Sequence, residues 1–189
     1  MERNYFIINT GSASKKYALY RGEKRVFFAH FETEGEKHVV TVDCGSSVER
    51  EISEKDFNNS LDYIYKELVG SGALTDPQRE ISAVGFRIVA PGEYFAKHRL
   101  IDDEYVKNLK AERESAPLHI EPMLNELVLV RKLLRGIRVI GVSDSVFHST
   151  LPAHAYTYAI QHDVAEKFGI RKFGYHGSSF ASVVRKVDA

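Results

Sequence analysis

Several features that mark whole classes of protein are missing from this sequence. A single cysteine, Cys44, stands among 189 residues, so no disulfide can form within the chain. The segment after Met1 has no apolar signal-peptide region, and together with the lone cysteine this predicts a reducing, cytoplasmic setting. No apolar run approaches the roughly 20 residues that cross a bilayer, because charged residues interrupt each one. We therefore expect no membrane-spanning segment.

An excess of either charge is missing as well. Lysine plus arginine and aspartate plus glutamate both total 26, which gives a formal net charge of zero. This balance indicates no broad basic surface for nucleic acid or for an anionic membrane. Hydrophobic residues make up 43% of the chain and charged residues 28%, which is the composition of a globular protein with a real core. Disordered and collagen-like chains are excluded.

The first 44 residues predict an antiparallel meander. Short runs rich in aromatic and β-branched residues alternate with glycine-bearing turns. The strands are expected at residues 4–9, 15–20, 24–32 and 37–44.

The middle of the chain alternates helices with buried strands. Apolar residues recur at helical spacing over 53–68, where Ser53 is placed to cap the helix with Asp56 three residues on. The order of elements predicts an α/β fold with a mixed sheet, in which an antiparallel meander is joined by strands reached through crossover helices. The further elements are expected as strands at 81–89 and 137–142 and as helices at 102–114 and 120–135.

The character of the chain changes after Pro152. A polar and aromatic stretch leads into a short helix at 161–168 and a second expected helix at 179–186. We expect residues 1–152 to form one domain and residues 153–189 to begin a second domain or to form a C-terminal extension. The aromatic residues of this tail predict an exposed apolar surface, and therefore a dimer or a docking partner.

The turn between the first two strands is the first candidate site. Residues 9–16, NTGSASKK, combine a glycine, hydroxyls and lysines. The backbone N–H groups, hydroxyls and cation of such a turn can hold a phosphate. The same residue types also make an ordinary hairpin turn, and this segment alone leaves both interpretations open.

Arg87, in the apolar run 83–89, is the second candidate. Its guanidinium cannot lose its charge, so near the end of a buried strand it needs an anionic partner. A bound carboxylate or phosphate would serve, since ligands collect at strand ends in open α/β folds. A structural ion pair, for example with Glu93, is the alternative.

Two further turns carry candidate polar groups. His119 could donate a hydrogen bond to an anion beside Leu118 as an apolar wall, or it could cap the helix that follows. Asp144 comes just after the strand at 137–142 and could orient a nucleophile or bind a metal through water, with an N-cap role as the alternative.

The last candidate is the segment 171–179, RKFGYHGSS. Glycines flank Tyr175 and His176 and permit close backbone approach. A hydroxyl-rich helix start could hold an oxyanion, although by itself the segment also fits a plain loop.

Together and in order, these segments resemble the acetate and butyrate kinase family of acyl-phosphate-forming kinases. INTGSASKKYAL is similar to the family's opening INAGSSSLKF, VGFRIVAPGEYF to its VGHRVVHGGEKF, and ESAPLHIEP to its LAPLHNPxN. GVSDSVFHSTLPAHAYTYAI resembles VFDTAFHQTMPxxAYxYAIP, and IRKFGYHGSSF resembles IRRYGFHGTSH. The resemblance covers about the first half of the family's length and implies the ribonuclease H-like fold of the sugar kinase and actin superfamily.

The resemblance also implies a reaction and a set of site residues. The reaction is phosphoryl transfer from ATP, with Mg²⁺, to a short-chain carboxylate, which gives an acyl phosphate. The implied catalytic residues are Arg87, His119, Asp144 and His176. The implied acyl pocket consists of Val89, Leu118 and Tyr175. The implied phosphate side of the cleft consists of Asn9, Ser12, Ser14 and Lys16, with Asn9 also facing the metal.

This chain departs from the family pattern near the implied site. Phe86, Ala90 and Pro91 stand where the pattern has two histidines and a glycine, and the family's nucleotide-binding second half lies outside the resemblance. We therefore carry two hypotheses. One is a carboxylate kinase domain that works as a homodimer or with a C-terminal-half partner; the other is a non-catalytic subunit that binds a small anion or regulates a partner.

Overall fold

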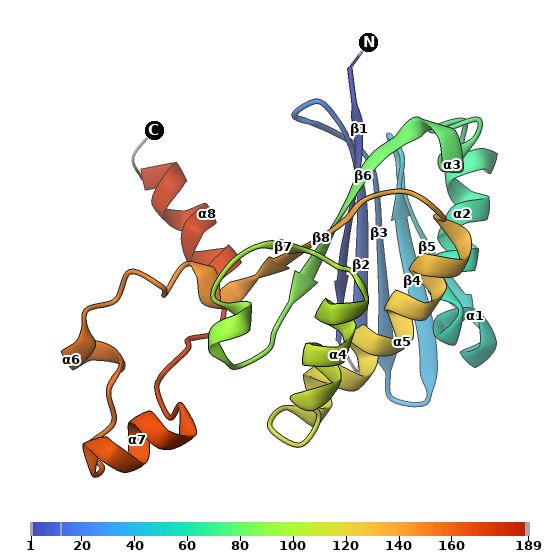
Figure 1. Ribbon diagram of the computed structural model, residues 1–189. Coiled ribbons are helices and arrows are strands. Elements are labelled where there is room, and N and C mark those ends of the chain that lie inside the picture. The colour runs from blue at the N-terminus through green and yellow to red at the C-terminus, as the bar shows by residue number, and fades with distance from the viewer. Residues whose placement is uncertain (1, 12, 188–189) are drawn as a thin grey trace.

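The computed structural model describes residues 2–11 and 13–187 of the chain. Eight strands form one mixed sheet in the order β5-β4-β3-β2-β1-β6-β8-β7 (Figure 1). The strands are β1 (Asn4–Thr10), β2 (Ser14–Arg21), β3 (Lys24–Glu34), β4 (Lys37–Asp43), β5 (Ser47–Ile52), β6 (Ile81–Ile88), β7 (Arg99–Leu100) and β8 (Val139–Ser143).

The sheet has an antiparallel part and a parallel part, as the order of elements predicted. Strands β1 to β5 pair antiparallel in sequence order. Strand β6 then pairs parallel to β1, and β8 pairs parallel to β6. The edge strand β5 was not predicted, because it carries no alternation of buried residues and five of its six positions are exposed.

Strand alternation decides which face of the sheet holds the core. In β1, Phe6 and Ile8 are fully buried, whereas Tyr5 and Ile7, on the opposite face, are more than one-third exposed. The buried face packs against α1, α2, α4 and α5, whose apolar residues join one continuous core (Figure 1). The even residues of β1 therefore anchor the fold, and its odd residues, Asn9 among them, face away from these helices.

The helices between the strands differ slightly from the prediction. The expected helix at 53–68 is two helices that break at Asn59, and Ser53 caps the first by accepting the N–H of Asp56 at 3.1 Å. The expected helices at 102–114 and 120–135 are confirmed as α4 and α5. The helices of this part are α1 (Glu54–Asn58), α2 (Ser60–Gly70), α3 (Pro77–Glu80), α4 (Asp103–Ala111) and α5 (Pro117–Leu133), with short 3-10 turns at Glu93–Phe95 and Asp144–Val146.

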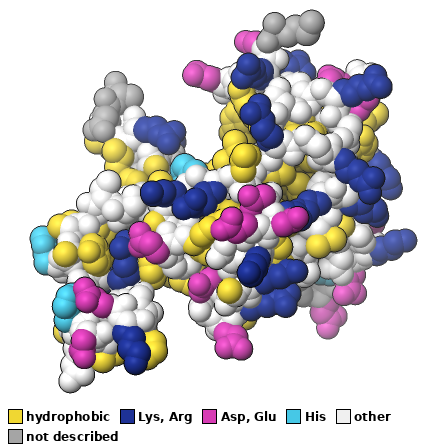
Figure 2. Space-filling view, viewed as in Figure 1, with side chains coloured by type: hydrophobic (Ala, Val, Ile, Leu, Met, Phe, Trp, Pro, Cys, Tyr) yellow, Lys and Arg dark blue, Asp and Glu magenta, His cyan; other side chains and the backbone are white. Residues whose placement is uncertain are grey.

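The tail after Pro152 extends beyond the sheet (Figure 1). It contains α6 (Ala153–Tyr156), α7 (His162–Phe168) and α8 (Gly177–Val187), so both predicted tail helices are confirmed. Figure 2 shows hydrophobic side chains at the surface of this tail, while charges of both signs are mixed over the body of the protein. Within residues 2–11 and 13–187, no helix is both long enough and apolar enough to span a membrane.

Candidate functional site

A cleft of about 430 Å³ lies where β1, β2, β6, the start of α5 and the segment before α8 meet. Eight of the eleven residues that sequence reasoning selected line it. The lining consists of Asn9, Thr10, Gly11, Ser14, Lys16, Arg87, Val89, His119, Tyr175, His176 and Ser179.

The other three selected residues are not part of the described lining. Ser12 lies outside the described residues. Asp144 lies behind the cleft and reaches it through Arg87, as described below. Leu118 lies on the outer side of α5 with 74% of its surface exposed, outside the lining that the described residues form. Its assignment to an apolar pocket stays a prediction.

The sheet topology brings the cleft residues together. Because β1 and β6 are parallel neighbours, their carboxyl ends meet at one edge of the sheet. Asn9 and Arg87 lie near these two ends, both on the face turned away from the covering helices. Asn9 also pairs with Lys16 across the β1–β2 hairpin. Residues far apart in sequence therefore form one polar wall.

Arg87 is held in place by two acceptors. Its Nη2 donates to Oδ2 of Asp144 at 2.6 Å and its Nε donates to Oδ1 at 3.3 Å, while its Nη1 donates to Oδ1 of Asn9 at 3.1 Å. The side chain of Arg87 is 27% exposed and that of Asp144 only 1%. The guanidinium thus faces the cleft with its orientation fixed from behind, which suits it to bind an anion.

Arg87 does form an ion pair within the protein, but not with Glu93, the example given for that alternative. Glu93 pairs with Arg171 of the tail at 3.0 Å, and Asp144 takes its place beside Arg87. The reason is geometric, since β6 and β8 are parallel neighbours and Asp144 directly follows β8.

Asp144 also receives three hydrogen bonds from the start of α8. Its carboxylate accepts the N–H of His176 at 3.1 Å, the N–H of Ser178 at 3.2 Å and the Ser178 hydroxyl at 2.7 Å. Burial opposes ionisation of this carboxyl, but the bonds from Arg87 and Ser178 outweigh it and hold the pKa of Asp144 below its usual value. Asp144 therefore joins the arginine to the helix, in part as a cap.

His176 and Gly177 show how closely this segment is packed. His176 has a φ of 59°, a left-handed conformation that costs free energy for a residue with a Cβ atom. A Cβ atom on Gly177 would overlap the carbonyl oxygen of Asp144. The contacts with Asp144 therefore hold His176 at the cleft in a conformation that the isolated segment would avoid.

Part of the cleft lining is apolar or aromatic. The rings of His119 and Tyr175 lie 6.1 Å apart, centre to centre, at an angle of 32°. Val89 is buried at the end of β6, where its N–H points to the sulfur of Met123 at 3.4 Å. Val89, His119 and Tyr175 thus contribute apolar surface to the lining that also contains Arg87.

His30 is a polar neighbour of the cleft that sequence reasoning missed. On β3 it lies opposite Lys16, and its Nε2 is 3.0 Å from the hydroxyl of Ser14. Burial and the Lys16 charge lower the pKa of His30, and Glu32 opposes them. A strand prediction that ran the register from Ser14 and Lys16 across the hairpin to β3 would have found it.

A divalent cation does not find a complete site in this set of residues. Across the part of the chain that the structure describes, no three histidine, cysteine or acidic side chains come together as ligands. The side-chain oxygen of Asn9 already accepts from Arg87, and a cationic neighbour is unfavourable beside a hard metal ion. The residues present fit an anion much better than Mg²⁺.

Comparison with known proteins identifies relatives along nearly the whole chain. The model of the Acetokinase family matches residues 4–189. The chain is 37% identical to acetate kinase from Thermotoga maritima over 188 residues, which are 95% of this chain and 46% of that protein. It is 36% identical to acetate kinase from Brachyspira hyodysenteriae over 202 residues, covering 98% of this chain and 51% of that protein.

Solved structures show the same relationship. A propionate kinase from Francisella tularensis superposes with a TM-score of 0.85 at 25% identity, covering 97% of this chain and 48% of that one. Acetate kinase from Porphyromonas gingivalis gives a TM-score of 0.80 at 31% identity, covering 94% of this chain and 46% of that one. The chain spans about half the length of the relatives it matches, and the fold is the expected ribonuclease H-like one.

Proposed function

Because this chain belongs to the acetokinase family, we propose that it is the anion-binding half of a kinase that phosphorylates a short-chain carboxylate. The whole reaction transfers the terminal phosphoryl group of ATP to a carboxylate oxygen, with ADP as leaving group and an acyl phosphate as product. The observation that carries the proposal is the cleft, in which Arg87, Lys16 and two histidines face one small cavity.

The charges of the cleft match the needs of phosphoryl transfer. Such a reaction depends on positioning and on neutralising charge on the phosphoryl oxygens more than on covalent chemistry. Arg87, fixed by Asp144 and Asn9, would hold the carboxylate or the phosphoryl group. Lys16 and Ser14 would bind phosphate oxygens, in the role that we also propose for Ser12.

The remaining cleft residues shape the acceptor. His119 and His176 would donate hydrogen bonds to the phosphoryl oxygens as charge builds up there. Val89 and Tyr175 would enclose the short alkyl group of the carboxylate, and we keep Leu118 as a wall that an incoming chain segment could complete. Asp144 would act through Arg87 and the start of α8, since its oxygens are already occupied by donors from both.

ATP and Mg²⁺ belong to the proposal as co-substrate and cofactor of the whole enzyme. Mg²⁺ would neutralise phosphate charge. Asn9, which the family resemblance assigns to the metal side, has its side-chain oxygen occupied by Arg87, so in this half it would not ligate the ion in this arrangement. Because the described residues offer no complete metal site, we propose that the metal arrives with the nucleotide on a second half of the enzyme. Residues 153–189 would lead into that half, in the same cytosolic setting that the lone cysteine predicts.

The first test is anion binding by this chain alone. Inorganic phosphate and acetyl phosphate are titrated by isothermal calorimetry at low ionic strength, where the charges of the cleft are least screened. We expect binding that Arg87→Ala removes. Arg138→Ala is the matched control, because Arg138 is an exposed arginine of the same charge outside the cleft lining. Equal losses in both variants would contradict the proposal.

The second test supplies the half of the relatives that this chain does not cover. The chain is mixed with the C-terminal part of the Thermotoga maritima relative that it does not cover, together with ATP, Mg²⁺, acetate and hydroxylamine as a trap for acyl phosphate. We expect hydroxamate that depends on both polypeptides and on Arg87. A stoichiometric complex that forms no hydroxamate, while the chain still binds phosphate, would favour a subunit that only binds anions.

One observation favours that second function. Phe86 and Ala90 are both buried, and neither side chain has a hydrogen-bond donor. Two of the three departures from the family pattern therefore cannot donate to a ligand. Proline at position 91 lacks an N–H group as well. Under this alternative, phosphate raises the thermal midpoint of the chain, and no partner adds turnover.

A further inference from the structure

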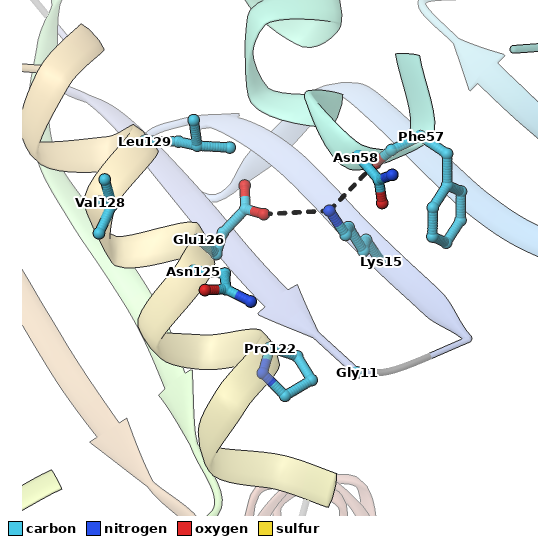
Figure 3. Close-up of a pocket in the computed structure, with 9 residues that line it drawn as sticks. All are labelled: Gly11, Lys15, Phe57, Asn58, Pro122, Asn125, Glu126, Val128 and Leu129. Carbon is cyan, nitrogen blue, oxygen red and sulfur yellow. Dashed lines mark hydrogen bonds and ion pairs between the residues drawn. The ribbon is translucent and has the colours of Figure 1, made fainter. Parts of the chain in front are cut away.

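A second cavity, of about 450 Å³, shares Gly11 with the cleft (Figure 3). Lys15 of β2 and Glu126 of α5 point toward each other at its base, with Nζ and Oε2 3.4 Å apart. The side chain of Lys15 is 12% exposed and that of Glu126 only 1%. The cavity thus ends on a buried ion pair that the proposed reaction does not use.

The ion pair belongs to a closed ring of four side chains. Lys15 donates to the hydroxyl of Ser60 at 2.9 Å, and the Tyr17 hydroxyl donates to Oε1 of Glu126 at 2.7 Å. Since the ammonium only donates, the Ser60 hydroxyl accepts from Lys15. It donates its own hydrogen bond to the Tyr17 oxygen, 2.7 Å away. The third donor position of Lys15 is taken by the carbonyl oxygen of Phe57 at 3.0 Å. Every donor has an acceptor.

Stability alone does not account for such a ring. Replacing a buried ion pair with well-packed apolar residues is often neutral or stabilising, because two charges no longer have to leave water. The family opening INAGSSSLKF has leucine and phenylalanine at the positions of Lys15 and Tyr17. The charged and hydroxyl groups that β2 gives to the ring are therefore departures from that motif, and a role in placing other residues would account for a buried ion pair that stability alone does not explain.

The ring ties together two elements that also carry cleft residues. Along β2, Lys15 and Tyr17 point to the helices, while Ser14 and Lys16 alternate with them and face the cleft. Along α5, Glu126 follows His119 by seven residues, or about two helical turns and roughly 10 Å, on the same side of the helix. A shift of α5 against β2 would therefore move His119 relative to Lys16.

We propose that Glu126 is a positioning residue: through Lys15 and Tyr17, the ring fixes Lys16 and His119 relative to each other across the cleft. The inference rests on the proposed function only in taking phosphate as the probe of the cleft. It assigns Glu126 no contact with substrate.

Electrostatics and positioning predict opposite results for Glu126→Gln. Removing a negative charge near an anion site strengthens anion binding if charge alone matters. Loss of the ring weakens it, and we expect inorganic phosphate to bind at least tenfold more weakly in the folded variant, followed by NMR titration. Glu121→Gln is the control, because Glu121 lies on α5 and pairs with Arg113 outside the ring. It should leave affinity unchanged or slightly higher.

A triple variant separates positioning from folding. Lys15→Leu, Tyr17→Phe and Glu126→Leu together remove the ring without leaving a buried charge unpaired. We expect a thermal midpoint at or above that of the parent chain, together with phosphate binding still at least tenfold weaker. A stable triple variant with parental phosphate affinity, or a folded Glu126→Gln with equal or tighter binding, overturns the inference.

A further readout does not depend on phosphate at all. The backbone amide and ring signals of Lys16 and His119 in the free protein report their surroundings directly. We expect both to shift in folded Glu126→Gln, which changes no neighbour of Lys16 in β2, and to stay in place in Glu121→Gln. Unchanged signals overturn the positioning role whatever phosphate does. Shifted signals in a chain that binds no phosphate support the positioning role and contradict the proposed function instead.

Discussion

The Arg87 guanidinium and the Asp144 carboxylate form a two-pronged ion pair between neighbouring parallel strands, with Nη2 and Oδ2 2.6 Å apart. The same carboxylate accepts the N–H groups of His176 and Ser178 at the start of α8. One buried group thus orients the Arg87 side chain and the backbone of His176. Because these groups are ordered before an anion arrives, binding loses less entropy.

Asp144→Asn tests this relationship. The amide keeps the size of the side chain but loses the charge. Its NH₂ group is itself a donor, so it faces N–H or O–H donors that the carboxylate oxygen accepted. We expect the free energy of unfolding to fall by about 3–5 kcal/mol, as for other broken buried pairs, and phosphate affinity to fall at least tenfold. Denaturant unfolding and calorimetric titration measure the two effects.

Asp103→Asn is the matched control for that substitution. Asp103 also pairs with an arginine, Arg131, at 2.7 Å, but its side chain is 97% exposed. Exposed pairs contribute little, so the change in unfolding free energy should stay below about 1 kcal/mol. Similar effects in the two variants would contradict the role assigned to Asp144.

Gly177→Ala tests the packing at the start of α8. The added Cβ atom would overlap the carbonyl oxygen of Asp144, so the helix start must move and its bonds to the carboxylate weaken. We expect a loss of about 2 kcal/mol or more and weaker phosphate binding. Gly70→Ala, at the end of α2 with no atom within 4 Å of the new Cβ, should stay within about 1 kcal/mol of the parent chain.

The pH dependence of stability should carry a signature of His30. Burial and the Lys16 charge lower its pKa below the ordinary value of 6.5. The folded state therefore binds fewer protons than the unfolded state below that value, and stability falls as the pH drops from 6.5 toward the lowered pKa. His30→Gln should make the thermal midpoint depend less on pH between pH 7 and pH 5.

Glu32, which pairs with His30, tests the same pH dependence in the opposite direction. Its carboxylate lies 3.2 Å from Nδ1 of His30 and raises the pKa of that ring. Glu32→Gln should therefore lower the pKa of His30 further and steepen the loss of stability on acidification. A shallower slope in this variant would show that His30 does not set the dependence.

The sequence predicts the fold well because its signals are local. Strand alternation and glycine turns place β1 to β4, and the cap of Ser53 on Asp56 is confirmed. Strand β5 escapes prediction because its residues are held by pairing with β4 and not by burial. Its existence depends on a neighbour, which no local pattern records.

The site is predicted in membership but not in pairing. Motif resemblance selects Arg87, His119 and His176, and all three line one cleft in the structure; their roles stay a prediction. The pairing of Arg87 with Asp144, and of Lys15 with Glu126, joins residues 57 and 111 positions apart. Such contacts follow from strand order and helix packing, so sequence spacing alone could not select them.

The size of the proposed acyl pocket can be tested directly in the two-polypeptide assay. Val89 is buried and lines the cleft, whereas Leu118 lies outside its described lining. Val89→Ala should enlarge the pocket and raise kcat/KM for butyrate relative to acetate by about fourfold or more, since a buried methylene contributes about 0.8 kcal/mol. Leu118→Ala should shift the ratio less than Val89→Ala, because Leu118 would reach the pocket only through the wall that the added polypeptide completes. An equal or larger shift would place the pocket nearer to α5.

The apolar face of α8 should decide how this chain associates. Val183, Val184 and Val187 form one exposed stripe with Phe180, at helical spacing of three and four residues. Val183→Glu places a charge on this stripe without disturbing a packed core, so the isolated chain should keep its thermal midpoint. We expect it to weaken association with the second half at least tenfold in calorimetric titration. Ser182→Glu adds the same charge one position away, on the other side of the helix, and should not.

Sedimentation of the isolated chain then distinguishes the two possible partners of the exposed stripe, a second copy of this chain and the second half of the enzyme. If two copies of this chain pair through α8, Val183→Glu converts a dimer to a monomer before any second half is added. If the stripe is instead reserved for the second half, the parent chain and the variant sediment alike, and only the mixture distinguishes them. We expect the second result, because the start of α8 is fixed to the cleft through Asp144, so whatever covers the stripe also lies beside the site that it would complete.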